Sequence, residues 1–155
     1  MVLRGSNGGG KDPEFRILGY RLYTVSEDDG RSWQPTKPWT YTDGAAFYSP
    51  SSMSPLIRHG NGSYFWLGNI SASYPRRNSP RYPFYVGRVD PHTMLLERDS
   101  LLRIDTSGND EPRDMTLSSF FAREDRESGQ LVLHLSRWML PAWVGNAYIH
   151  HIDVE

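Results

Sequence analysis

Residues 26–33 read Ser-Glu-Asp-Asp-Gly-Arg-Ser-Trp, and no other stretch of the sequence indicates its fold as strongly. The pattern is Ser-x-Asp-x-Gly-x-Ser-Trp, and every constrained position suits a tight hairpin. Asp28 can accept backbone N–H groups within its own turn, and Gly30 supplies a positive φ. Ser26 and Ser32 can hydrogen-bond across the turn, while Trp33 covers the hairpin base with a large apolar area. The stretch therefore predicts a β-hairpin stabilised by its own side chains.

The sequence on both sides of this turn predicts short strands. Gly, Pro, Asn and Asp recur at short intervals, and the segments between them are rich in aromatic and β-branched residues. Leu131, Leu133 and Leu135 alternate with other residues and would share one strand face. The predicted strands are Met1–Arg4, Arg16–Ser26, Met53–His59, Ser63–Asn69, Phe84–Asp90, Met94–Arg98, Leu101–Asp105, Thr116–Glu124, Gln130–Arg137 and Ala147–Val154.

Three turns join some of these strands. Asn61-Gly62 lies between apolar runs and predicts a hairpin in which both residues have positive φ. Asp125–Gly129 predicts a longer hairpin loop, and Asp90–Thr93 joins two further strands. A helix over Asp114–Glu127 is an alternative, because this segment lacks Gly and Pro and could form a helical apolar stripe. The hairpins recur at roughly 30–40 residues, near the ~40–50 of a propeller blade.

Length and composition exclude several classes. A chain of 155 residues makes one domain or part of a larger one. A net charge of −1 provides no strong positive field for nucleic acid, and no apolar run approaches the ~20 residues of a membrane helix. Without cysteine there is no disulfide, thiolate metal site or thiol nucleophile. The first residues lack the apolar core of a secretory signal, so we expect any signal of a secreted or periplasmic full-length protein to lie upstream.

Residues 26–33 resemble the Asp-box, the recurring hairpin motif of sialidases and related six-bladed propellers. In order along the chain, further segments are similar to the last blades of bacterial sialidase-like (BNR-repeat) proteins. These segments are Tyr41–Gly44, Phe47–Ser52, Leu56–Gly62, Tyr64–Ile70, Pro80–Phe84 and Glu124–Gly129. The resemblance implies an all-β fold, a partial β-propeller of sialidase type with about three four-stranded antiparallel blades. Residues 1–15 would form an inner strand and a Gly-rich loop or linker, and residues 16–155 the C-terminal blades of a larger ring.

The same resemblance implies a function. The chain would be a fragment of an exo-acting, sialidase-like glycoside hydrolase, inactive in isolation because the opposite half of the ring is missing. One alternative is a non-catalytic carbohydrate-binding or structural β-propeller module. Another is a closed β-sandwich unrelated to propellers, which strand topology would distinguish.

Candidate site residues follow from what the resemblance implies. Sialidases bind a carboxylate sugar with three converging arginines and use a Tyr nucleophile helped by a Glu. Arg4 and Arg81 would bind the substrate's anionic group, and Tyr48 and Glu124 would be nucleophile and helper. Asn69 could hydrogen-bond a sugar hydroxyl, and Trp66 could stack on a sugar face. The sequence shows neither a clean arginine triad nor a clearly paired Tyr and Glu. The Asp-box residues Ser26, Asp28, Gly30, Ser32 and Trp33 would be structural, away from the substrate.

Two other motifs carry little chemistry. Gly5–Lys11 nearly matches a phosphate-binding loop, but Asp12 and Pro13 follow where a hydroxyl is needed. His151 and Asp153 would share a strand face, yet two ligands do not make a metal site. We therefore expect no cofactor or metal, a glycan or acidic sugar as partner, and neither nucleic acid nor membrane. An incomplete ring also predicts self-association through open blade edges.

Overall fold

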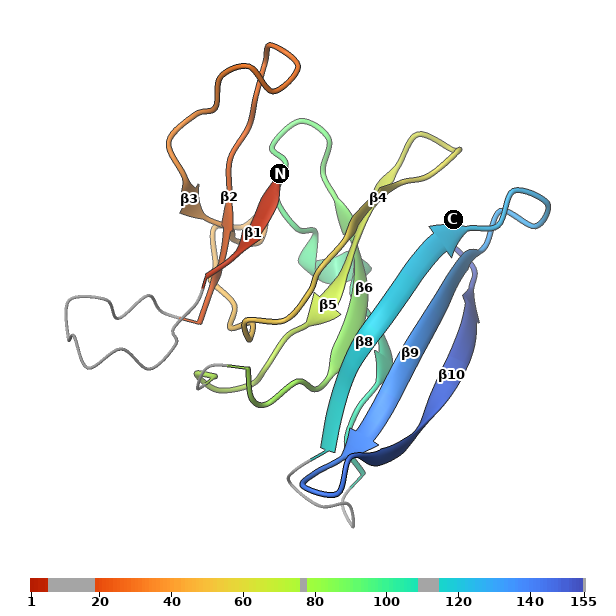
Figure 1. The fold of residues 1–155 in the computed structure, drawn as a ribbon. Helices are drawn as coiled ribbons and strands as arrows, with labels where there is room; N and C mark the ends of the chain where they lie inside the picture. Colours follow the sequence, from red (N-terminus) through yellow and green to blue (C-terminus); the bar gives the residue numbers. More distant parts are fainter. Residues whose placement is uncertain (6–18, 76–77, 109–114, 155) are drawn as a thin grey trace.

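The computed structural model describes residues 1–5, 19–75, 78–108 and 115–154, and it shows an all-β protein (Figure 1). The strands form three antiparallel sheets of three or four strands. The first contains β1 (Val2–Arg4), β2 (Arg21–Tyr23) and β3 (Lys37–Pro38). The second is a meander of β4 (Leu56–Arg58), β5 (Tyr64–Asn69), β6 (Phe84–Val89) and β7 (Leu102–Asp105). The third contains β8 (Met115–Glu124), β9 (Leu131–Met139) and β10 (Val144–Ile152).

The middle sheet is covered on both faces, and strand alternation explains how. Successive side chains of a strand point to opposite faces. Phe65 and Leu67 of β5 therefore join a core with β8 and β9, whereas Trp66 faces a second core. The first core also contains Phe84, Val86, Met115, Leu117, Phe120, Leu131, Leu133, Leu135 and Ile152. The second contains Trp39, Tyr41, Phe47, Val89 and Leu96, with Val2 and Tyr23 of the first sheet packed against it.

The third sheet resolves the choice between strand and helix. The helical alternative is wrong for the described part of Asp114–Glu127, because Met115–Glu124 forms β8. Its pairing with β9 shifts register between Ser118 and Phe121, and Ser119 has a φ of 52°. A bulge of this kind breaks the strict alternation of the strand and gives the sequence its helix-like spacing. In β9 the predicted alternation is confirmed, since Leu131, Leu133 and Leu135 are all buried.

The predicted turns form, although one has a different conformation, and one predicted strand does not form. Gly62 (φ 90°) and Gly129 (φ 72°) close their hairpins as expected. Asn61, however, is not left-handed: the Gly62 N–H donates to the His59 carbonyl, so the loop is a turn followed by one left-handed glycine. The predicted strand Met94–Arg98 is also wrong. Met94 has a φ of 60°, Leu96 makes only isolated bridges, and the 3-10 helix η2 begins at Arg98 and ends at Ser100.

Residues 6–18 lie outside the described part of the chain, and most of the Gly-rich segment belongs to them. In the described part, η2 has three residues, and no helix there is long and apolar enough to cross a membrane.

Candidate functional site

The Asp28 turn forms the hydrogen bonds that its residues predict. Asp28 Oδ1 accepts the Ser32 N–H at 2.8 Å, and Oδ2 accepts the Ser32 hydroxyl at 2.6 Å. The Ser26 hydroxyl donates to Asp28 at 2.8 Å and accepts the Gly30 N–H at 2.7 Å. Gly30 has a φ of 85°, and Trp33 Nε1 donates to its carbonyl. Hydrogen bonds from Ser32 are the main cause that lowers the pKa of Asp28 to about 2.

Arg21 is the buried centre of a second polar cluster, which the sequence did not predict. Its side chain is only 1% exposed. Nε donates to Ser49 Oγ at 2.8 Å, and the two terminal nitrogens donate to the carbonyl and hydroxyl of Ser52 at 2.7 and 3.0 Å. All three partners are neutral oxygens, and no carboxylate of the described residues pairs with this guanidinium. Burial, with the charge of Arg4 second, lowers the pKa of Arg21 to about 10.

Arg4 lines the same cavity as this buried charge, and its own charge also reaches Arg81. The charge of Arg4 acts on the pKa of both other arginines, because repulsion between like charges favours loss of a proton. Burial is the larger cause that lowers the pKa of Arg81. Arg81 Nε donates to the Asn78 carbonyl at 3.0 Å, and neither Arg4 nor Arg81 forms an ion pair with a described carboxylate. We call Arg4, Arg21 and Arg81 the arginine cluster.

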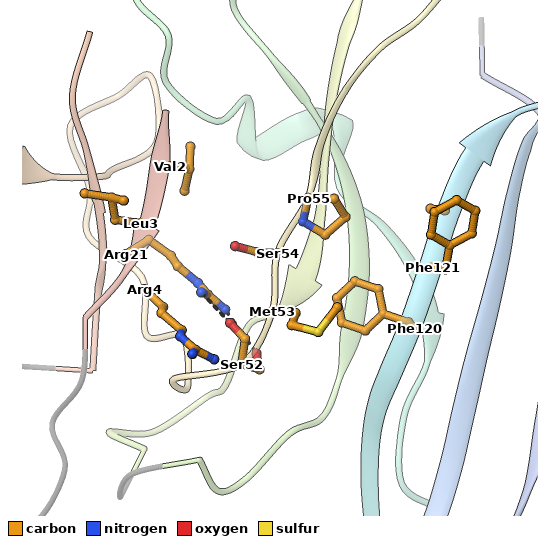
Figure 2. Close-up of a pocket in the computed structure, with 11 residues that line it drawn as sticks. Val2, Leu3, Arg4, Arg21, Ser52, Met53, Ser54, Pro55, Phe120 and Phe121 are labelled. Carbon is orange, nitrogen blue, oxygen red and sulfur yellow. Dashed lines mark hydrogen bonds between the residues drawn. The ribbon is translucent and has the colours of Figure 1, made fainter. Parts of the chain in front are cut away.

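A cavity of about 520 Å³ opens beside the arginine cluster. Figure 2 shows Arg4 and Arg21 reaching from β1 and β2 toward Ser52, with Phe120 of β8 across the cavity beside Met53. One wall is thus cationic and the other apolar. The volume lies within the range of ligand pockets, roughly 300–1,000 Å³. Arg81 is outside the residues that line this cavity and adjoins it through Arg4.

Asn69 and Trp66 are fully buried, so neither presents a face to a sugar. The Asn69 amide accepts the Ser52 hydroxyl at 2.9 Å and donates to the Arg81 carbonyl at 2.9 Å and that of Leu117 at 3.4 Å. Asn69 therefore holds the backbone beneath Arg81 in place, which makes it a positioning residue. Trp66 packs edge-on against Trp39 and lies 6.0 Å from the Arg21 guanidinium. The predicted sugar contacts of Asn69 and Trp66 are not possible in this arrangement.

Tyr48 belongs to a group of three tyrosines. Its ring stacks on Tyr20, with centroids 5.6 Å apart and planes 5° apart, and Tyr74 packs edge-on against it at 5.9 Å. Burial is the first cause that raises the pKa of Tyr20, followed by its interactions with Tyr48. Tyr20 and Tyr48 directly precede Arg21 and Ser49 in the chain, so the tyrosines lie at the same end of β2 as the buried guanidinium.

Glu124 lies far from Tyr48. Its carboxylate accepts the Gly60 N–H at 2.8 Å and lies 3.5 Å from His59 Nε2, at the hairpin that leads into β5. Tyr48 instead bridges Ser71, just beyond the other end of β5. Six residues of β5 span roughly 20 Å, so the structure does not bring the predicted nucleophile and helper together. Glu124 joins two hairpins, since His59 Nε2 also donates to the Gly129 carbonyl at 2.7 Å.

The sequence reasoning missed Arg21, Ser49 and Ser52. Arginine is mostly exposed in proteins, and the partners of Arg21 are 28 and 31 residues away. The pair Ser51-Ser52 after Pro50 was a weak signal, because hydroxyls that follow a proline lie on a stiff segment.

Among the described residues, no group of three or more His, Asp or Glu could hold a metal ion. No family model, no curated protein and no solved structure matches the chain. The function must therefore be inferred from the geometry itself.

Proposed function

We propose that this chain is part of a sialidase-like β-propeller and that its arginine cluster binds the carboxylate of an acidic sugar. The observation that carries this proposal is the cluster itself: Arg4, Arg21 and Arg81 lie together, and no described carboxylate neutralises them. A buried guanidinium without a counter-charge is costly, and a bound anion would relieve that cost.

The chemistry of arginine favours a carboxylate ligand. The planar guanidinium meets a carboxylate with two parallel hydrogen bonds and keeps its charge at all physiological pH values. Arg4 is exposed and Arg81 half-buried, so these two would contact the ligand. The Arg21 guanidinium is already hydrogen-bonded to Ser49 and Ser52. It would attract the ligand's negative charge without contacting the ligand. The apolar wall at Met53 and Phe120 suits a ligand that also carries an apolar group.

The propeller interpretation is supported by the order of the sheets. The middle sheet is a sequential four-stranded meander, and its two faces pack on cores shared with the sheets before and after it in the chain. Propeller blades are meanders of this kind. The hydrogen-bonded Asp28 turn adds a local feature typical of sialidase-like blades.

Catalysis is a separate part of the proposal. We propose that the full-length protein is a glycoside hydrolase and that this chain is one part of it. We expect no turnover by these 155 residues alone. Tyr48 and Glu124 lie at opposite ends of β5, which favours the second candidate function, a non-catalytic carbohydrate-binding module. A fluorogenic sialoside distinguishes the two: release of the fluorophore by the purified chain would contradict the expectation of inactivity.

Binding is tested by calorimetric titration with N-acetylneuraminic acid and with its methyl ester. We expect heat of binding for the acid and none for the ester, because esterification removes the charge and keeps the ring. Arg4→Gln and Arg81→Gln should each weaken binding by about tenfold or more, the size of a lost charge-assisted hydrogen bond. Arg58→Gln, at an exposed arginine of β4, is the matched control and should bind normally. Equal binding of acid and ester would overturn the proposal.

A further inference from the structure

The sheet edges of the described chain differ in how well they are protected. An edge strand exposes unpaired N–H and C=O groups, and proteins protect such edges with short strands, charges, proline or a covering segment. The outer edge of β8 is covered at one end, where the Leu117 N–H donates to the Arg81 carbonyl at 3.0 Å, and its other end carries the charged residues Arg123 and Glu124. The remaining edges are short strands that carry charged residues or proline, namely β1 with Arg4, β3 with Lys37 and Pro38, β4 with Arg58, and β7 with Arg103 and Asp105.

β10 has none of these protections. It is nine residues long, contains no Asp, Glu, Lys, Arg or Pro, and pairs with β9 along its whole length without a register shift. Figure 1 shows it on the outside of the third sheet, with no described segment beyond it. Val144 and Ile149 are 65% and 59% exposed. His150 Nε2 is buried and has no hydrogen-bond partner among the described residues.

We propose that β10 pairs edge to edge, antiparallel, with β10 of a second copy of this chain. A two-fold axis at Tyr148 sets Val144 opposite Ile152 of the partner subunit and Asn146 opposite His150 of the partner subunit. The cross-strand neighbours in this register are uncharged, with apolar Val144 beside Ile152 and the Asn146 amide beside the His150 ring. No charge meets another charge along the strand.

The same comparison of sheet edges indicates which strand of a second copy pairs with β10. Any other edge of a second copy would bring proline, a short strand or an uncompensated charge against β10. β10 against itself is self-complementary, and a two-fold contact closes as a dimer rather than growing into a fibre. This proposal is independent of the arginine cluster, which lies on other elements.

Sedimentation velocity over a range of concentrations tests the proposed β10 dimer. We expect a monomer–dimer equilibrium for the unaltered chain. Tyr148→Lys places two ammonium groups against each other on the axis and should weaken the dimer by roughly tenfold or more. Phe121→Lys is the control: Phe121 is 64% exposed on the same sheet but lies on β8, so the dimer should be unchanged. A monomer at every concentration, an unaffected Tyr148→Lys dimer or a lost Phe121→Lys dimer would each overturn the proposal.

Two further experiments test the register and do not depend on a loss of function. Mixing Tyr148→Lys with Tyr148→Glu should restore a dimer made of one copy of each. The chain has no cysteine, so Tyr148→Cys gives a single thiol on the axis. Opposed residues of antiparallel strands have Cα atoms about 4.5–5.5 Å apart, within the span of a disulfide. We expect mild oxidation to crosslink Tyr148→Cys and not Phe121→Cys; absence of the crosslink would contradict pairing at Tyr148.

Discussion

The Asp28 turn and the arginine cluster are both built from charged side chains that bond to serines, yet they differ in how far apart their members lie in the sequence. Asp28 bonds to Ser26 and Ser32, two and four residues away. Arg21 bonds to Ser49 and Ser52, 28 and 31 residues away. The turn is exposed and can form with little help from the rest of the chain. The cluster exists only when separate strands have already come together.

This difference predicts different responses to mutation. A buried network couples the elements that it joins, so the loss of one member weakens the whole fold. An exposed turn opens locally, at a free-energy cost below that of global unfolding. The predictions below test that contrast, beginning with the largest expected effect.

Asn69→Ala should destabilise the chain by about 3 kcal/mol, because it removes a buried amide that bonds to Ser52, to the Arg81 carbonyl and to the Leu117 carbonyl. Urea denaturation measures the change. The same substitution, Asn69→Ala, should also weaken binding of the carboxylate ligand, since Asn69 holds the backbone of Arg81.

Asn61→Ala is the matched control for Asn69→Ala. Among the described residues, the Asn61 side chain accepts the Ser63 N–H alone, within an exposed hairpin loop, so we expect a loss of about 0.5 kcal/mol. Equal losses in the two variants would mean that the long-range network contributes no more than a local bond.

The contrast also explains which parts could be predicted from the sequence. Asp28, Gly30 and Ser32 form their turn from neighbouring residues, so their spacing alone indicates its hydrogen bonds. The alternation of Leu131, Leu133 and Leu135 likewise records one buried face. Burial of β5 on both faces does not appear as alternation, which is why Trp66 and Asn69 were expected at a ligand. Arg21 could not be recognised, because its partners are set by tertiary packing.

Asp28→Asn should affect the hairpin alone. The neutral amide accepts weaker hydrogen bonds than a carboxylate, so the Gly30 and Ser32 amides should exchange with solvent roughly tenfold faster. Amide exchange followed by NMR measures this, with the β9 amides as internal reference. Faster exchange in β9 as well would show that the turn is coupled to the whole fold.

The pH dependence of the unaltered turn has a defined sign. The pKa of Asp28 is about 2 in the folded chain against an ordinary 3.8, so its stabilising contribution is complete above about 3.8. The contribution is lost as the pH falls from 3.8 toward 2, as the carboxylate becomes protonated. We expect the fluorescence of Trp33 to change in this window. Asp28→Asn should lack that transition.

Met94→Gly tests a turn that combines a local backbone conformation with a long-range hydrogen bond. Met94 has a φ of 60°, at the position where the Asp125 loop has Gly129, and its carbonyl accepts Trp39 Nε1 at 2.7 Å from 55 residues away. Glycine adopts this conformation without strain and keeps the carbonyl, so we expect a gain of about 0.5–1 kcal/mol. Gly129→Ala, the converse change, should lose about 1 kcal/mol in the same thermal unfolding assay. A loss in Met94→Gly would mean that packing of the Met94 side chain outweighs the backbone strain.

Arg4→Gln has a small expected effect on stability, and its sign separates a binding cluster from a structural one. Arg4 repels Arg21 and Arg81, so its removal should stabilise the chain by about 0.5 kcal/mol at low ionic strength. The gain should shrink in 0.5 M salt, where the Debye length falls to roughly 4 Å. The same variant should bind the carboxylate ligand less tightly. If the arginines form a site with uncompensated charge, Arg4→Gln should raise the stability of the chain and lower its affinity for the ligand. If Arg4 is structural, the same substitution should lower the stability.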